Sequence, residues 1–318
     1  MSLRSSPPRL RAGVATLVAM IVACIAGPWF IRPLPGMDPA RAALLPPGSL
    51  VTVVVRTDGA VYLSPRIERR AHSIVVIGPG ERRIDIPNAR IARLSVHRYW
   101  LGSDRFGKDL LRESLTGGRI SLTVASLALV IALVIGGGVG LLAATSGSLA
   151  DALLMRLVDA FLAFPILFLL ILAVALFKPG PPALIIILGL SSWMGLARLV
   201  RGQVLSLRQR DFVKAAQVAG SPWWRIWELH YAPNLVGPVA QDAALRLGDL
   251  VLAEATLSYL GLGIPPSTPT WGSLVAEGHK VLLQGWWLAT FPGLAIASLV
   301  IALALVGDGL QELVRDVR

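Results

Sequence analysis

Five uncharged runs, each long enough to cross a lipid bilayer, constrain this chain more than any other feature of its sequence. They cover Ala12–Ile31, Ser121–Ala150, Ala160–Phe177, Pro179–Ala197 and Val281–Gly307. A helix needs about 20 predominantly apolar residues to cross the hydrocarbon core. Charged residues make up only 15% of the chain, and its mean hydropathy is +0.66, which is too apolar for a soluble protein. The sequence therefore predicts an all-α polytopic membrane protein.

A further crossing, the fifth in chain order and the one that makes six in all, is predicted at Leu235–Leu262, although this apolar segment carries four ionisable residues: Asp242, Arg246, Asp249 and Glu254. Charges are tolerated within a span when they face a cavity or pair with one another. The first three follow at i, i+4 and i+7, so they share a helical face and can pair. We interpret the four residues either as an ion network that fixes helix register or as the polar wall of a solute pathway.

The basic residues predict how the six spans are oriented. Three arginines precede the first run: Arg4, Arg9 and Arg11. Because basic residues are enriched on the cytoplasmic side of membrane proteins, we expect a cytoplasmic N-terminus. An even number of spans then places the C-terminal tail Glu312–Arg318 in the cytoplasm, together with the basic region 198–225.

The single cysteine of the chain bears on processing and on metal binding. Residues 21–24 resemble a degenerate lipoprotein cleavage box, so a cleaved signal peptide competes with a first span. The apolar run continues past Cys24, which favours the span. One cysteine forms no disulfide or cysteine metal site within the chain. The four histidines show no i, i+4 pair, so the sequence predicts no metal site and no catalytic residues.

The arginine-rich stretch between the first two spans predicts a small β domain outside the membrane. Leu50–Val55 and Ala60–Leu63 flank an Asp-Gly pair, which is a strong hairpin signal. Ser73–Ile77, Arg83–Ile86 and Ile91–Leu94 favour further short strands, giving four or five in all. We expect domains at 1–48 (tail, first span and start of the external loop), 49–95 (external β domain) and 96–318 (transmembrane domain). The β domain docks a partner, gates entry or is an inert spacer.

A polar, tryptophan-rich segment at 211–234 lies between the fourth and fifth spans, on the cytoplasmic side by this topology. It predicts two short helices. Asp211 can cap the first, and Gly220 can end it in the left-handed conformation. Ser221 and Pro222 can start the second, and Pro233 can end it. Large aromatic residues on a basic connector fill a partner's pocket or lie at a membrane interface, and here they are Trp223, Trp224 and Trp227.

Two glycine-containing stretches have different interpretations, one as a loop and one as a packing surface. Gly102–Asp109 approaches a phosphate-binding loop, but Asp109 stands where such a loop needs Ser or Thr for magnesium. Gly136–Gly140 allows close approach of another helix, in this chain or in a partner. The net charge of +11 follows the segments between spans rather than one basic face, so nucleic-acid binding is not predicted.

Four motifs in order resemble the permease subunits of bacterial ABC importers for dipeptides, oligopeptides and nickel, specifically the second of the two permeases. His97–Leu111 resembles the family's Leu-Gly-Thr-Asp, two residues, Gly-Arg-Asp segment, through Gly102, Asp104, Gly107 and Asp109. The cytoplasmic motif Glu-Ala-Ala, three residues, Gly, then Leu-Pro is matched by Lys214, Ala215, Ala216, Gly220 and Pro233. Leu252–Pro266 with Pro269–Gly272, and Phe291–Gly293 with Gly307–Leu310, match two further motifs.

The sequence also departs from this family. Residues 49–95 stand where the family has a short link. Lys214 replaces the usual glutamate, and Leu303–Val306 lacks an asparagine that the family tends to carry.

The resemblance implies an inner-membrane permease that forms half of a translocation pathway for peptides. Its implied partners are a related permease, as a heterodimer, two cytoplasmic ATPases and an extracytoplasmic substrate-binding protein. ATP and magnesium would bind in the ATPases, so this chain would hold no cofactor and be no enzyme. The residues matching the cytoplasmic motif, with the three tryptophans, would couple it to an ATPase. A permease for nickel or another small solute is the alternative, followed by a stand-alone secondary transporter or channel.

Overall fold

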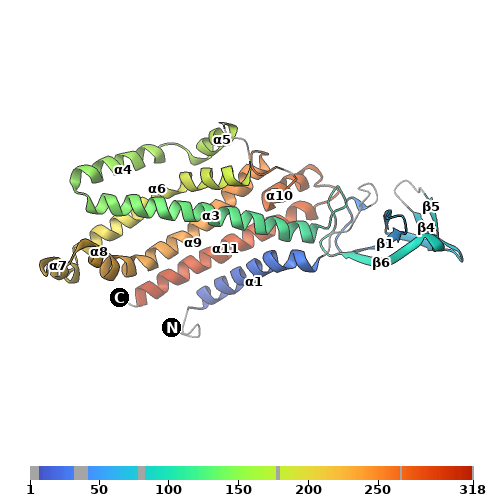
Figure 1. The fold of residues 1–318 in the computed structure, drawn as a ribbon, viewed down its shortest axis with the longest axis horizontal. Coiled ribbons are helices and arrows are strands. Elements are labelled where there is room, and N and C mark those ends of the chain that lie inside the picture. Colours follow the sequence, from blue (N-terminus) through green and yellow to red (C-terminus); the bar gives the residue numbers. More distant parts are fainter. Residues whose placement is uncertain (1–6, 32–41, 78–82, 177–179, 266, 317–318) are drawn as a thin grey trace. The chain divides into compact units, whose positions relative to one another are not determined.

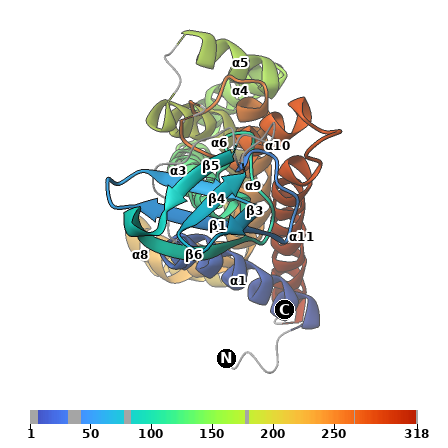
Figure 2. The ribbon, with the colours of Figure 1, turned by 90° about the vertical axis from the view of Figure 1, so that its right-hand side faces the viewer.

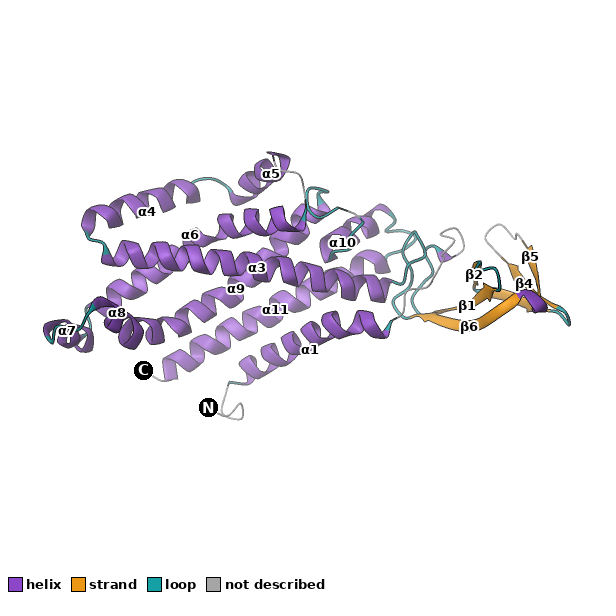
Figure 3. Cartoon of the chain, viewed as in Figure 1, coloured by secondary structure: helices purple, strands orange, loops and turns teal. Residues whose placement is uncertain are grey.

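The computed structural model describes residues 7–31, 42–77, 83–176, 180–265 and 267–316 (Figures 1 and 3). Arg4, the start of the predicted external loop at 32–41 and the last two residues lie outside the described residues. The chain divides into two compact units, which are described separately. A helical unit comprises Met1–Met20, Ser121–Pro265 and Ile296–Arg318. A mixed unit comprises Ile21–Ile120 and Pro266–Ala295.

Long apolar helices dominate the described chain, as its uncharged runs predict. Within the described residues, four helices are long and apolar enough to cross a membrane. They are α1 (Pro8–Phe30), α3 (Leu110–Thr145), α6 (Pro181–Arg208) and α11 (Trp287–Asp316), the last judged over Trp287–Leu313. The helix α9 (Ala232–Tyr259) covers the predicted fifth crossing but is not among the four.

The run Ala160–Phe177 does not form the single helix that was expected. It is divided between α4 (Ser148–Leu162) and α5 (Ile166–Leu176), and Pro165 lies at the break. Proline has no amide to donate and its ring obstructs the preceding turn, so a helix ends before it unless neighbouring groups compensate. The run Val281–Gly307 also differs from the prediction. Its first residues form a turn after α10 (Trp271–Lys280), and the helix α11 begins only at Trp287.

The glycine run of α3 serves two different faces. A Cβ at Gly136 would lie 2.6 Å from the Trp193 carbonyl oxygen, and one at Gly140 would lie 2.5 Å from that of Ala197. These two glycines, four residues apart, therefore let α3 and α6 pack backbone to backbone. A Cβ at Gly137 or Gly138 meets nothing within 4 Å. The first pair thus packs within this chain, while the second pair borders open space.

Among the described residues of the mixed unit, six strands precede α3, and Figure 2 looks onto them. One antiparallel sheet has the order β2-β1-β6 and the other the order β3-β4-β5. The Asp-Gly hairpin forms as predicted, with Gly59 at φ +84° and the Asp58 carboxylate accepting from the Ala60 amide at 3.0 Å. The strands are β1 (Ser49–Arg56), β2 (Val61–Ser64), β3 (Arg66–Arg69), β4 (Ser73–Ile77), β5 (Arg83–Pro87) and β6 (Ile91–Tyr99).

The strands differ from the prediction in two respects. The short, charged β3 was not expected, because only Ile67 in it is apolar. Strand β6 runs four residues past 95, where the predicted β domain ends, because its whole length pairs with β1 from Ser49↔Tyr99 onward. Val51, Val53, Leu63 and Tyr99 form a buried cluster that holds β2, β1 and β6 together.

Candidate functional sites

The first helix of the segment 211–234, α7 (Asp211–Val218), is followed by the predicted left-handed glycine. Gly220 has φ +73°. Its amide donates to the Gln217 carbonyl at 3.0 Å, and the Ser221 amide donates to the Ala216 carbonyl at 3.0 Å. These are the two bonds of a Schellman motif, which favours glycine at this position. The expected Asp211 cap is absent, because the helix already begins at that residue and the amides of Val213 and Lys214 donate to the Arg210 carbonyl.

The sequence predicts that the second helix ends at Pro233, but in the structure it continues past this residue. The short helix α8 (Trp223–Ile226) passes into a π turn, η4 (Trp227–Tyr231), and then directly into α9. The Ala232 amide donates to the Trp227 carbonyl, five residues back. Pro233 therefore falls in the first turn of α9, where no amide is needed. Neither Ser221 nor Pro222 makes a side-chain cap; Pro222 itself is the residue preceding α8.

The three tryptophans of this segment divide into an exposed pair and an inward residue. Trp223 is 77% exposed and Trp224 is 54% exposed. Trp227 instead packs against the Tyr231 ring and the buried cluster that contains Ile226. The first two side chains are thus exposed, whereas Trp227 is half-buried. Of the remaining motif residues, Lys214 and Ala215 are exposed and Ala216 is half-buried.

Two of the four charged residues of α9 form an ion pair. Arg246 donates to both Asp242 carboxylate oxygens, from Nε at 2.9 Å and from Nη2 at 3.0 Å. Its Nη1 donates to the Ser192 carbonyl oxygen of α6 at 2.6 Å. A Cβ on Gly195 would come within 3.2 Å of the guanidinium. The predicted i, i+4 pair therefore forms, and α6 supplies both a partner and the space for it.

The other two charged residues lie apart from this pair. Asp249 is exposed. Glu254 is fully buried, and it accepts hydrogen bonds at 2.7 Å from the hydroxyls of Ser121 on α3 and Ser258 on its own helix. Glu254 thus joins α9 to α3 through Ser121, whereas Arg246 joins α9 to α6 through the Ser192 carbonyl.

Two ion pairs between α4 and α6 were not foreseen. Arg201 forms a two-point contact with Asp151, with Nη2 to Oδ2 at 2.6 Å, and Arg198 pairs with Asp159. Both arginines and both carboxylates are at least partly exposed. The partners are 50 and 39 residues apart in sequence, so no helical spacing indicates them.

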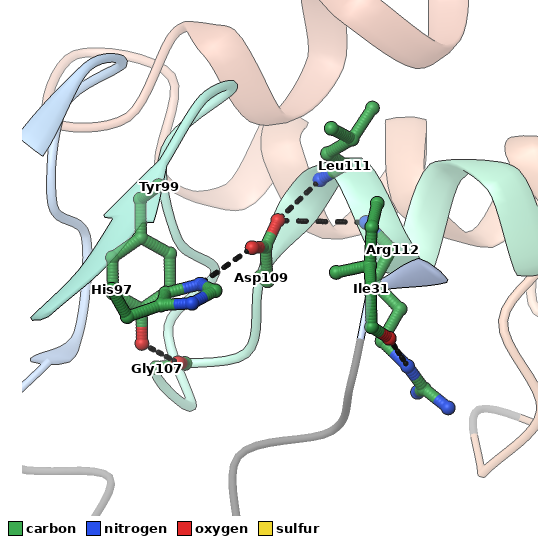
Figure 4. Close-up of polar contacts among 7 residues, drawn as sticks. All are labelled: Ile31, His97, Tyr99, Gly107, Asp109, Leu111 and Arg112. Carbon is green, nitrogen blue, oxygen red and sulfur yellow. Dashed lines mark hydrogen bonds and ion pairs between the residues drawn. The ribbon is translucent and has the colours of Figure 1, made fainter. Parts of the chain in front are cut away.

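The motif segment 97–112 contains a densely hydrogen-bonded turn (Figure 4). Asp109 accepts from the Leu111 amide at 2.9 Å, which caps the start of α3, and contacts His97 Nε2 at 2.8 Å. The Tyr99 hydroxyl donates to the Gly107 carbonyl at 2.9 Å, and Arg112 donates from Nε to the Ile31 carbonyl at 3.1 Å. The turn thus fastens the end of α1 and the end of β6 to the start of α3, all within the mixed unit.

The same turn is unsuited to cradling phosphate. Asp104 Oδ1 accepts from the amides of Phe106 at 2.8 Å and Lys108 at 2.7 Å, so two amides that an anion would need are already used. Gly102 and Gly107 have φ +88° and +74° and allow the chain to fold tightly around Asp104. Burial raises the pKa of Asp104, against the lowering effect of these two bonds. Among the described residues, no group of three His, Cys, Asp or Glu side chains could hold a metal ion.

Comparison with known proteins places these features in a family. A putative peptide transport system permease protein of Brucella suis is 37% identical over 230 residues, which cover 71% of this chain and 77% of that protein. A di/tripeptide transport system permease protein of Pseudomonas aeruginosa is 37% identical, over 68% of this chain and 71% of that protein. The fold is similar to a chain of the inward-facing MetNI methionine ABC transporter, with a TM-score of 0.52 and 20% identity, over 64% of this chain and 94% of that one.

The family match itself covers more than half of the chain. Residues 136–316 match the family described as binding-protein-dependent transport system inner membrane component. That range contains the Gly220 turn, the exposed tryptophans, the π turn and the ion pair of α9. The chain therefore belongs to the family of inner membrane components of binding-protein-dependent transport systems.

Proposed function

We propose that this chain is one of two permease subunits of an ATP-driven importer of peptides. The observation that carries the proposal is 37% identity, over about seven tenths of the chain, to relatives named as peptide and di/tripeptide permeases. A second, related permease completes the translocation pathway. An extracytoplasmic binding protein delivers the solute, and two cytoplasmic ATPases bind ATP and magnesium. This chain needs no cofactor of its own and catalyses no covalent step.

The segment 211–234, called the coupling segment below, is the proposed contact with one ATPase. Trp223 and Trp224 are large apolar side chains exposed in a segment that also carries the exposed basic residues Lys214 and Arg225. Aromatic anchors of this kind dominate protein interfaces when a partner's pocket covers them. Because α8 continues through the π turn into α9, a displacement of these tryptophans reaches α9 without crossing a flexible loop. ATP-driven closure of the ATPases thereby tilts the helix that carries Arg246.

The proposed topology has six crossings and cytoplasmic termini. The crossings are α1, α3, the α4–α5 pair, α6, α9 and α11, of which four have the length and hydropathy of independent spans. The α9 crossing is supported by the pairing of Arg246 and Asp242, which lowers the cost of placing charge in a span. The strands between α1 and α3 then lie outside the cytoplasm, where they dock the binding protein or gate entry. Asp242, Arg246 and Asp249 line the solute pathway.

The test is solute uptake into vesicles containing the complete transporter. Radiolabelled di- and oligopeptides, presented with the binding protein, accumulate only when ATP is enclosed with the ATPases, and an ionophore that abolishes ion gradients has no effect. Accumulation of nickel in place of peptide would support the alternative substrate. Uptake that requires an ion gradient and no ATPase would overturn the proposal.

A further inference from the structure

The helical unit contains two adjoining hollows, one of which is lined in part by the segment 211–234. One, of about 440 Å³, lies between α3, α6 and α9 and is lined by apolar groups, among them Leu133, Gly137, Gly138 and Val239. The other, of about 460 Å³, lies between the end of α3 and the segment 211–234. Both are lined by Leu141 and Trp227, so together they form one groove.

The groove has the length of one bilayer leaflet. Its lining on α3 extends from Leu133 to Thr145, which is about 18 Å at the rise of an α-helix. One leaflet contributes about 15 Å of hydrocarbon. Gly137 and Gly138 deepen the apolar half, since a Cβ at either would meet nothing within 4 Å.

The two ends of the groove differ in chemistry. The end near Leu133 is apolar. The opposite end is lined by Arg208, Gln217, Thr145 and Tyr231, and its nine lining residues include one cation and no acid. Trp223 also lines this end. Aromatic rings and arginines gather at the headgroup level of membranes, and basic pockets between helices bind anionic lipid headgroups.

We propose that this groove holds an anionic phospholipid, with its phosphate at Arg208 and one acyl chain along Gly137 and Gly138. The polar end of the groove lies beside the coupling segment, and the apolar end extends toward the middle of α3. A lipid would lie in the same way, with its headgroup at the membrane surface nearest residues 211–234 and its acyl chain directed toward the bilayer centre. A helix from a second subunit is a poorer fit. An apolar helix would leave Arg208 without a counter-charge, whereas a lipid phosphate supplies one.

Occupancy of the groove would bear on coupling. The lipid would contact Trp227 and Tyr231, which form the two ends of the π turn, and Gln217 of α7. It would thereby brace the coupling segment against α3. The inference concerns a site distinct from the solute pathway, and its test does not depend on which solute is carried.

The experiment uses the assembled transporter in phosphatidylcholine vesicles. The probe is phosphatidylglycerol with a diazirine on one acyl chain, and phosphatidylcholine with the same group is the matched probe. After photolysis, mass spectrometry of peptides measures labelling at 133–145 and 231–239. We expect the phosphatidylglycerol probe to label these peptides more than the phosphatidylcholine probe does. Arg208→Gln should lower the phosphatidylglycerol signal about tenfold, as expected for loss of a charged hydrogen bond.

Two further variants test the apolar half. Gly138→Leu should fill the groove without a clash and abolish labelling by either probe, whereas Gly202→Leu should not, because Gly202 is equally open but lines neither hollow. Arg210→Gln is the control for Arg208→Gln. Equal labelling by the two probes, or an unchanged signal in Arg208→Gln, would overturn the proposal. So would a disulfide between Gly138→Cys and a cysteine placed in the second permease, because it would show a protein in the groove.

Discussion

Residues 97–112 and residues 211–234 both carry family motifs and both turn at glycines of positive φ, yet their side chains lie in opposite environments. In the first segment Asp104 and Asp109 are buried and accept hydrogen bonds from backbone amides of the same turn. In the second, Trp223 and Trp224 are exposed. The carboxylates of the first segment have their hydrogen-bond partners within the chain. The second segment exposes two large apolar rings, whose burial by a partner would be favourable. Motif residues can thus serve folding or contact, and burial distinguishes the two roles.

The largest effect is expected from Gly220→Val. Valine at φ +73° is strained by its Cβ, at a cost of about 1–2 kcal/mol or more for a β-branched residue. The turn between α7 and α8 should then lose its geometry, and ATP-driven uptake should fall to background while membrane insertion persists. Gly202→Val, in the helical region of α6 with nothing within 4 Å, is the control. A wild-type rate of uptake by Gly220→Val would contradict the role of segment 211–234 in contact with a partner, which is what separates it from segment 97–112.

The next effect is expected from replacing both exposed tryptophans by alanine. If Trp223 and Trp224 fill a pocket on an ATPase, uptake and co-purification of the ATPase should fall about tenfold or more. The melting temperature of the chain should hardly change, since neither ring is buried. Trp100→Ala, which removes a 58% exposed tryptophan outside the coupling segment, should leave ATPase association intact. An equal loss in both variants would argue against a specific contact.

A smaller and purely structural effect is expected from Asp109→Ala. This change removes the cap of α3 and the contact with His97, so it should lower the free energy of unfolding by about 1–2 kcal/mol. Thermal unfolding of the purified chain measures this loss. Uptake per folded transporter should stay near the wild-type rate. Asp85→Ala, at an exposed carboxylate with only a 3.8 Å contact to Arg70, should cost much less. Loss of uptake without loss of stability would give the turn around Asp109 a functional role.

The smallest effect concerns pH. Burial raises the pKa of Asp104 in the folded chain, so the folded state binds a proton more readily than the unfolded state. The stability from this group is therefore present below the ordinary aspartate pKa of about 3.9 and is lost as the pH rises through the folded pKa. Asp104→Asn keeps the oxygen that accepts both amides and should remove this dependence. Identical pH profiles of stability for the two proteins would contradict it.

The sequence predicted features that depend on local spacing and missed those that depend on distant partners. Apolar length indicated α1, α3, α6 and α11, and the i, i+4 spacing indicated the pair of Asp242 and Arg246. The serine partner of Glu254 on α3 is 133 residues away, so no pattern could show it. The break at Pro165 was missed because a proline inside an apolar run can be tolerated when neighbouring helices satisfy the freed backbone groups.

The coupling segment shows the same limit at the level of single side chains. The left-handed Gly220 follows from the chemistry of helix ends, and it was predicted. Which tryptophans face outward was not predictable, because Trp227 turns inward only through its packing on Tyr231 and the cluster beneath it. The passage of the helix through Pro233 was also missed, since it depends on the π turn that places this proline in the first turn of α9.

That π turn fixes an angular phase along the helix. Each residue of an α-helix advances the side chains by about 100° around the axis, and a π turn accommodates one residue that a regular helix would not. Deleting a single residue within 227–231 would therefore restore a regular helix and leave Asp242 and Arg246 at nearly the same rotational position relative to Trp223 and Trp224. Deleting a residue from the regular part of α9 before Asp242 would instead rotate both charges by about 100°. The π turn thus takes up one residue without changing the rotational register between the exposed tryptophans and the charged pair of α9.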